Sequence, residues 1–313
     1  MTGAGNGGLI DLHLHSTASD GTLEPSELVS RAISRGLIAI AVTDHDTIGG
    51  VKEAMAAGAE QGLEVVAGVE IGIAHEPERN LVEVDILGYL IDPDHRGLRQ
   101  SLDALQEAKN AKLRMQIEVL AENGFPIDES EVLEVACGDT VRRPHIWKVV
   151  HRHHAGLGAE DFFDRTSFGG EWHVSKTYSL SLEDAVALIE AAGGVPVMAH
   201  PGCYNSLFSR DGSLTDPSVD LAIRVCAGAG VKGLEVIYPY DKGRPYHNGG
   251  SLISKDQLRE LWEHYQGLAD ELGLVATGGT DFHGANKPQI EMGEIEISYS
   301  ALERLKELAG RAG

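Results

Sequence analysis

Two histidines separated by one residue, His13 and His15, lie in the segment "DLHLHSTASDG" at residues 11–21, and Asp20 follows five residues after the second. Alternate side chains of a β-strand point to the same face, so both imidazoles would lie on one side. Imidazole and carboxylate are ligands that Zn, Mn and Fe share. The segment alone is weak evidence, because histidines often only form hydrogen bonds within a core and Asp20 could simply close a turn with Gly21. The other ligands of a metal site would have to come from elsewhere in the chain.

Further histidines and carboxylates end or interrupt most of the other apolar segments. They are His45 in "VTDHD", Glu70 in "GVEIG", Asp85 in "VEVDILGY", His200 in "VPVMAH", and Asp281 and His283 after "LVATGGT". Each could separately be an ordinary polar residue in a loop, although a carboxylate such as Glu70 is costly to bury unpaired inside an apolar strand. Their joint occurrence at strand ends is hard to explain by coincidence. We therefore predict one metal centre, in which Glu70 bridges two ions.

The elements that would position these residues alternate between strand and helix in the first part of the chain. Apolar strands are expected at residues 9–14, 37–46, 63–74 and 81–91, with helices over about 25–36 and 50–61. This order predicts an α/β fold with a parallel sheet and helices outside it. In an α/β barrel the carboxyl ends of the strands form the active-site face, which would bring the polar residues together.

The alternation stops after residue 94. Residues 97–122, 129–136 and 143–154 have helical patterns, and no clear strand occurs between about 95 and 175. Alternation resumes with a helix at 181–194, strands at 195–201, 233–239 and 274–284, and helices at 216–229 and 255–272. We therefore predict a barrel formed by residues 9–94 and 179–313, with a helical insertion at 95–178. A mobile loop is expected at 240–251.

Composition limits the classes of partner. The 313 residues suffice for one barrel of about 250 residues and an insertion. A net charge of −22 argues against coating duplex DNA, although bound cations could reverse the field around a phosphorylated substrate. Cys137, Cys203 and Cys226 form no CxxC pair, which indicates reduced thiols and a cytoplasmic location. The start "MTGAGNGG" is read as a flexible tail and not a signal peptide, and no apolar run approaches the roughly 18 residues of a membrane span.

Five segments in order carry a family resemblance. "DLHLHSTASDGTLEP", "AVTDHDTIGG", "GVEI", "MAHPG" and "TGGTDFHG" resemble the successive motifs of the PHP (polymerase and histidinol phosphatase) family of metal-dependent phosphoesterases. The resemblance covers residues 9–92 and about 180–285. It implies a distorted (βα)7 TIM-like barrel, related to the amidohydrolases, with a helical lid. "RRPHI" at 142–146 and "AGGVPVMAHPG" are similar to a subgroup of stand-alone bacterial enzymes that act on 3′,5′-nucleotide bisphosphates and on short RNA from its 5′ end.

The resemblance also implies two or three divalent ions, with manganese expected first and iron or zinc as alternatives. One ion would be held by His13, His15, Glu70 and Asp281, a second by Asp20, His45 and His283, and a third by Glu70 and His200. The family usually has a histidine just before "ILGY", where this chain has Asp85. A carboxylate can bind the same metals, so Asp85 is included among the predicted ligands, and the occupancy of the third site is left open.

Substrate contacts are expected from the insertion. Arg143 could donate two parallel hydrogen bonds to a phosphate, and His145 one more. Lys176 is a further candidate. Without the resemblance, Arg143 could equally be a solvated residue at a helix start.

The expected chemistry is hydrolysis with a water activated by two close ions. Glu70 would bridge these ions, and His200 or Asp46 would protonate the leaving oxygen. We predict removal of the 3′-phosphate from a nucleoside 3′,5′-bisphosphate to give AMP and phosphate, or trimming of short 5′-phosphorylated RNA. The alternatives are a histidinol-phosphate type monoesterase, against which "RRPHI" argues, and a non-catalytic metal-binding PHP module, against which the ligand set argues. Neither duplex DNA nor a membrane is an expected partner.

Overall fold

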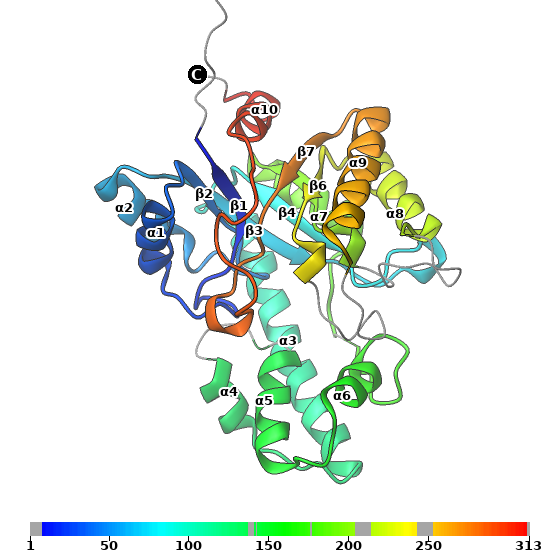
Figure 1. The fold of residues 1–313 in the computed structure, drawn as a ribbon. Coiled ribbons are helices and arrows are strands. Elements are labelled where there is room, and N and C mark those ends of the chain that lie inside the picture. Colours follow the sequence, from blue (N-terminus) through cyan, green and yellow to red (C-terminus); the bar gives the residue numbers. More distant parts are fainter. Residues whose placement is uncertain are drawn as a thin grey trace, which may run out of the picture.

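A curled half-barrel of seven strands, ordered β1 to β7, forms the centre of the computed structural model (Figure 1). The structure describes residues 8–136, 141, 143–175, 177–203, 214–242 and 253–311. The strands are β1 (Ile10–Leu14), β2 (Ala39–Val42), β3 (Glu64–Gly72), β4 (Asp85–Tyr89), β5 (Val195–Met198), β6 (Gly233–Ile237) and β7 (Val275–Gly278). Leu14, the last residue of the edge strand β1, forms a parallel bridge with Phe282, which follows the other edge strand, β7, so the edges approach each other where the predicted ligands lie.

The expectation of a wholly parallel sheet is wrong at β4. This strand is antiparallel to both β3 and β5, while the other neighbouring strands are parallel. A parallel pair needs a crossover connection, usually through an α-helix. Residues 73–84, which join β3 to β4, contain only the short helix η1 (Pro77–Arg79), so the chain turns back as a hairpin. An apolar segment indicates a buried strand but carries no information on its direction.

Helices cover the outside of the sheet, with α1 and α2 to one side and α8 and α9 to the other in Figure 1. They are α1 (Pro25–Ser34), α2 (Val51–Gln61), α7 (Leu182–Ala191), α8 (Pro217–Gly228), α9 (Lys255–Leu272) and α10 (Ser300–Leu308). Local sequence sets several of their ends. The Ser254 side chain and Gln257 form a capping box at the start of α9, and Gly62 ends α2 with a left-handed backbone.

The longest helix, α3 (Arg96–Glu122), joins two hydrophobic cores. Leu98 and Leu105 pack in the core that contains strands of the sheet, whereas Leu113 and Leu120 pack in a second core. The second core also holds side chains of α4 (Glu129–Ala136), α5 (Arg143–His153) and α6 (Ala159–Thr166), which lie below the sheet in Figure 1. Neither α3 nor any other helix in the described part of the chain is long and apolar enough to cross a membrane.

Candidate metal centre

Eight of the nine predicted metal ligands converge at one end of the sheet, and all eight are buried. Their potential ligand atoms form three groups, within each of which all atoms lie within 4.8 Å of one another. The groups are His15, Asp20, His45 and His283; His13, Glu70 and His200; and His13, His15 and Asp281. His15 belongs to the first and third groups, and His13 belongs to the second and third. The three groups therefore form one continuous cluster.

Glu70 lies at the centre of this cluster. Its side chain in β3 is fully buried. Its Oε2 atom lies 2.7 Å from His45 Nδ1 and 3.4 Å from the Nε2 atoms of both His13 and His15. The other oxygen, Oε1, lies 3.0 Å from His200 Nε2. A carboxylate that faces imidazoles with both oxygens has the arrangement needed to bridge two ions.

Charge and hydrogen bonding both indicate that the cluster fits cations. His13 Nε2 and Glu70 Oε2 are buried, and within the described part of the chain neither forms a hydrogen bond of good geometry, a costly state that a cation would relieve. Burial by itself would raise the pKa of Glu70, but His45 and His13 outweigh it and hold the pKa well below its ordinary value. Burial would lower the pKa of His13, but the carboxylates of Glu235 and Glu70 raise it well above the ordinary value. The donor set therefore fits divalent transition metals, which accept nitrogen and oxygen ligands.

The group around Asp20 has the neutral imidazole that a metal requires. Burial, and then the nearby His283 and His45, lower the pKa of His15 well below its ordinary value. The His15 ring centroid lies 4.0 Å from that of His283 and 4.3 Å from that of His45. Asp20 Oδ1 lies 3.0 Å from His283 Nε2 and 3.8 Å from His45 Nε2. Three imidazoles and one carboxylate thus face a common point.

Glu235 is a functional candidate that the sequence analysis missed. It is fully buried in β6, and its carboxylate lies 3.0 Å from His13 Nδ1 and accepts a hydrogen bond from the backbone N–H of His200 at 2.8 Å. A carboxylate only accepts, so Nδ1 carries a hydrogen, and a cation in the cluster would take the place of the second proton, at Nε2. The signal was present in "GLEVI", where a carboxylate interrupts an apolar strand as Glu70 does.

Asp281 is held in place by two donors outside the cluster. Its Oδ2 accepts hydrogen bonds from the Tyr238 hydroxyl at 2.8 Å and from Lys287 Nζ, while Oδ1 lies 3.1 Å from His15 Nε2. Burial would raise the pKa of Asp281, but Lys287 and then His283 lower it well below its ordinary value. The ionised carboxylate therefore presents one oxygen to the cluster.

Close backbone packing explains one glycine of "TGGTDFHG". A Cβ atom at Gly279 would lie 2.1 Å from the Cβ atom of His13, so no larger residue fits beside this histidine. Gly279 thereby lets the segment after β7 pass close to β1. This approach brings Asp281 and His283 to the cluster.

Two further buried carboxylates fix the surrounding loops. Asp44 accepts hydrogen bonds from the backbone N–H and hydroxyl of Ser16 and from the Ser19 hydroxyl, at 2.6–2.7 Å. Asp11 accepts hydrogen bonds from the backbone N–H and hydroxyl of Thr280 at 2.9 and 2.6 Å. These contacts hold the loop that carries Asp20 and the segment that precedes Asp281.

Two predicted residues have other surroundings. Asp85, the first residue of β4, is half-buried and pairs in register with Gly72, and it belongs to none of the three ligand groups found among the described residues. Asp46 forms an ion pair with Lys109 of α3 and accepts a hydrogen bond from the backbone N–H of Gly72 at 3.0 Å. The ammonium group of Lys109 favours the charged form of the Asp46 carboxylate, which makes Asp46 a weaker proton-donor candidate than His200.

Two of the predicted substrate residues lie at the start of α5, and one of them contacts the β3–β4 connection. Arg143, at the start of α5, donates to the Ser167 hydroxyl at 2.6 Å and forms an ion pair with Glu83 at 3.0 Å. His145 is buried two residues further along α5, and Lys176 lies outside the described residues. Burial, and then the positive charge of Lys112, lower the pKa of His173, and Arg143 contributes in the same direction. Lys112 and Arg143 therefore both lie near His173, as does Glu83, the partner of Arg143.

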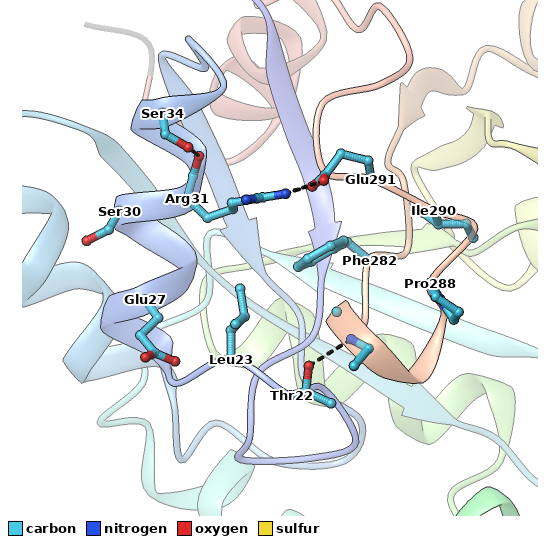
Figure 2. A pocket seen from close by; sticks show the side chains of 12 residues that line it. Thr22, Leu23, Glu27, Ser30, Arg31, Ser34, Phe282, Pro288, Ile290 and Glu291 are labelled. Atoms are coloured by element: carbon cyan, nitrogen blue, oxygen red, sulfur yellow. Dashed lines mark hydrogen bonds and ion pairs between the residues drawn. The ribbon is translucent and has the colours of Figure 1, made fainter.

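A cleft of about 660 Å³ opens between α1 and the segment after β7 (Figure 2). An ion pair between Arg31 and Glu291 crosses it, and the Thr22 hydroxyl accepts a hydrogen bond from the backbone N–H of Ala285 at 2.9 Å. None of the predicted ligands lines this cleft. We therefore place the candidate chemistry at the buried cluster and not in this cleft.

Comparison with known proteins identifies relatives along nearly the whole chain. The PHP domain model matches residues 11–157. A 3′,5′-nucleoside bisphosphate phosphatase of Chromobacterium violaceum is 32% identical over 92% of this chain and 91% of its own length. A 5′-3′ exoribonuclease of Haemophilus influenzae is 34% identical over 87% and 89%. A phosphoribosyl 1,2-cyclic phosphate 1,2-diphosphodiesterase of Eggerthella lenta is 29% identical over 88% and 94%.

Similarity extends to a solved structure. A candidate metal-dependent phosphoesterase from Bifidobacterium adolescentis superposes with a TM-score of 0.72, at 27% identity, over 95% of each chain. The described half-barrel and its helices thus have a counterpart of known structure.

Proposed function

Because the chain belongs to the PHP family of phosphoesterases, we propose that it hydrolyses the 3′-phosphate ester of a nucleoside 3′,5′-bisphosphate, giving AMP from the adenosine compound and inorganic phosphate. As a family member it is a hydrolase of phosphate esters. The observation that carries the proposal is the buried, Glu70-centred ligand cluster, and Arg143, with Lys112 near it, supports the second phosphate site. A short 5′-phosphorylated RNA is the second candidate substrate, supported by the relative from Haemophilus influenzae.

Seven of the eight clustered residues would hold two divalent ions. His13, His15, Glu70 and Asp281 would hold one ion, and Asp20, His45 and His283 would hold the other. Mixed nitrogen and oxygen donors support manganese, with iron or zinc as alternatives. A third ion would have Glu70 and His200 as its ligands, with Asp85 as the remaining candidate. When bound, divalent ions neutralise phosphate charge and supply a nucleophile at neutral pH.

The protein's own residues have separate roles in this proposal. Glu70 keeps the two ligand groups together, and Glu235 keeps the Nε2 lone pair of His13 directed at the cluster. His200 is the better proton-donor candidate. Burial would lower the pKa of His200, but the nearby Glu70 outweighs it and raises the pKa. Nε2 could therefore give a proton as long as no third ion is bound to it, since a ring nitrogen that binds a metal carries no proton. A donated proton would neutralise the leaving oxygen.

The second phosphate of the substrate would bind to Arg143. A phosphate offers the two acceptor oxygens that a guanidinium binds in parallel, and it would replace Glu83 as the partner of Arg143. His145 and Lys176 are proposed as further phosphate contacts. The positive charges of Lys112 and Arg143 support anion binding here despite the net charge of −22.

We also propose that residues 95–178 form a lid over the barrel residues 9–94 and 179–313, arranged as a distorted (βα)7 TIM-like barrel. The separate core of α3 to α6 supports a subdomain that packs by itself. The ion pairs Lys109–Asp46 and Arg143–Glu83 connect this segment to the end of the sheet that carries the cluster. Such a lid would exclude water from the substrate.

A substrate panel with added Mn²⁺ tests the function. Release of inorganic phosphate would be measured for adenosine 3′,5′-bisphosphate, AMP and histidinol phosphate, and the cleavage products of a short 5′-phosphorylated RNA and of phosphoribosyl 1,2-cyclic phosphate would be separated by chromatography, each with and without chelator. We expect the bisphosphate to be the best substrate and the chelator to abolish its cleavage. Preference for histidinol phosphate or the cyclic phosphate would overturn the assigned substrate. No turnover of any ester would favour a non-catalytic metal-binding role.

A further inference from the structure

An exposed aromatic cluster lies beside the candidate phosphate-binding arginine. The cluster consists of Phe168, His75 and His173. The Phe168 ring centroid lies 4.5 Å from that of His75 and 5.3 Å from that of His173, and both contacts are edge-to-face. Phe168 is nevertheless 40% exposed, which is unusual for a phenylalanine that already has two ring neighbours. Packing of the insertion against the sheet therefore leaves part of a large apolar ring open to solvent.

The aromatic cluster is tied to Arg143 by short contacts. Arg143 donates to the hydroxyl of Ser167, the residue directly before Phe168. Arg143, Lys112 and Glu83 are all close enough to His173 to shift its pKa, after the larger effect of burial. An anion held by Arg143 would thus lie next to the rings.

One ring of the aromatic cluster, His75, follows closely on the strand that carries Glu70. His75 follows Glu70 by five residues, so their Cα atoms are separated by no more than about 18 Å, the length of fully extended chain. Phe168 and His173 belong to the segment after α6, whereas His75 belongs to the β3–β4 connection. The three rings therefore come from both sides of the place where the insertion meets the sheet.

We propose that the exposed ring of Phe168, supported by His75 and His173, is the surface on which the nucleobase of the substrate stacks. The proposal rests on the proposed function, in which Arg143 holds the 5′-phosphate. Flat aromatic side chains next to cationic groups are the usual way in which proteins bind bases without reading their identity. Charge alone would hold a ribose bisphosphate equally well, so this aromatic cluster selects nucleosides over base-free ribose phosphates.

Binding of a fluorescent nucleotide tests this proposal independently of turnover. The probes are ethenoadenosine 5′-monophosphate, whose fluorescence is quenched by stacking, and ribose 5-phosphate as a base-free competitor, both with the Mn²⁺-loaded protein. Phe168→Ala should weaken nucleotide binding about five- to a hundredfold, the usual effect of removing one stacking ring. It should leave ribose 5-phosphate binding unchanged. Phe168→Tyr should retain nucleotide binding, because it keeps the ring.

Leu133→Ala is the matched control, since Leu133 is another exposed apolar residue of the insertion, at 45% exposure. It should change neither affinity. Unchanged nucleotide binding by Phe168→Ala, or equal losses for the nucleotide and ribose 5-phosphate, would overturn the stacking surface. If the bisphosphate is cleaved but Phe168→Ala binds normally, the stacking surface fails while the proposed function stands. If the bisphosphate is not cleaved but the nucleotide binds in a Phe168-dependent way, the stacking surface stands and the reaction has been misassigned.

Discussion

Glu235 and His13 form a fully buried pair in which a carboxylate oxygen lies 3.0 Å from His13 Nδ1. The same carboxylate accepts a hydrogen bond from the backbone N–H of His200 at 2.8 Å. One side chain thus fixes the orientation of a histidine on β1 and the backbone of another after β5. Two donors meet one carboxylate, so both of its oxygens are needed as acceptors.

Replacing Glu235 by glutamine should therefore weaken metal binding while the fold is retained. Glutamine has one acceptor oxygen for two donors, so either the His13 ring turns or one N–H loses its partner. We expect metal affinity to fall about ten- to a hundredfold, as for other residues that orient metal-binding histidines. Titration with Mn²⁺ and elemental analysis would measure the loss. Glu190→Gln, a substitution of a half-exposed glutamate on α7, should bind metal as the unchanged protein does.

Substitution of Glu70 tests its position between the ligand groups. Glu70→Gln keeps the size of the side chain but removes its charge, so the imidazoles around it lose their common anionic partner. We expect phosphatase activity to be abolished and the metal content to fall, with an unchanged circular dichroism spectrum. Turnover at the level of the unchanged protein would contradict the bridging role.

Metal should also stabilise the folded protein, because the buried ligands converge only in the native state. Binding to the native state alone adds about 2.7 kcal/mol to the free energy of unfolding at a metal concentration one hundred times Kd. Thermal unfolding of chelator-treated protein, with and without Mn²⁺, would reveal a higher Tm in the loaded sample. The same addition should raise the Tm of Glu70→Gln less. Equal Tm values for the loaded and metal-free unchanged protein would count against the centre.

Most of the sheet and the long helices could be predicted from sequence because each has a strong local signal. The helical pattern of 97–122 matches α3 (Arg96–Glu122), and the apolar segment at 195–201 contains β5. The direction of β4 could not be predicted from its own residues. It depends on the β3–β4 connection, which has no α-helix that could form a crossover. The short helices α6 and α10 were not predicted, although α4, which also has eight residues, was.

In the ligand cluster, too, the sequence predicted residue types at strand ends but not which residues contact one another. His13, Glu70 and Asp281 could be selected because each interrupts or ends an apolar strand. Glu235 has the same signal, but nothing in the sequence shows that its neighbour is His13, which is 222 residues away. The pairing of Asp46 with Lys109 was equally hidden, because it depends on where α3 crosses the end of the sheet.

Asp85 offers a test of the third ion. If its carboxylate replaces the histidine usual in the family, Asp85→His should change metal stoichiometry or preference more than it changes Tm. Elemental analysis and anomalous scattering from crystals of both forms would measure the difference. Identical metal content in both proteins would mean that Asp85 is not a ligand.

Arg143 offers the sharpest test of substrate choice. Arg143→Ala should lower kcat/KM for adenosine 3′,5′-bisphosphate by about two to four powers of ten, because a charge-assisted bidentate contact to the second phosphate is lost. A simple aryl phosphate, which has no second phosphate, should be affected much less.

The Arg143→Ala substitution also removes the ion pair with Glu83, so Glu83→Gln is the matched control for that contact. Glu83→Gln breaks the ion pair but keeps the arginine, and it should leave kcat/KM for the bisphosphate unchanged or raise it, since Glu83 competes with the phosphate. Equal losses on both substrates in both variants would mean that Arg143 acts by joining α5 to the β3–β4 connection, and the two-phosphate proposal would then have to be abandoned.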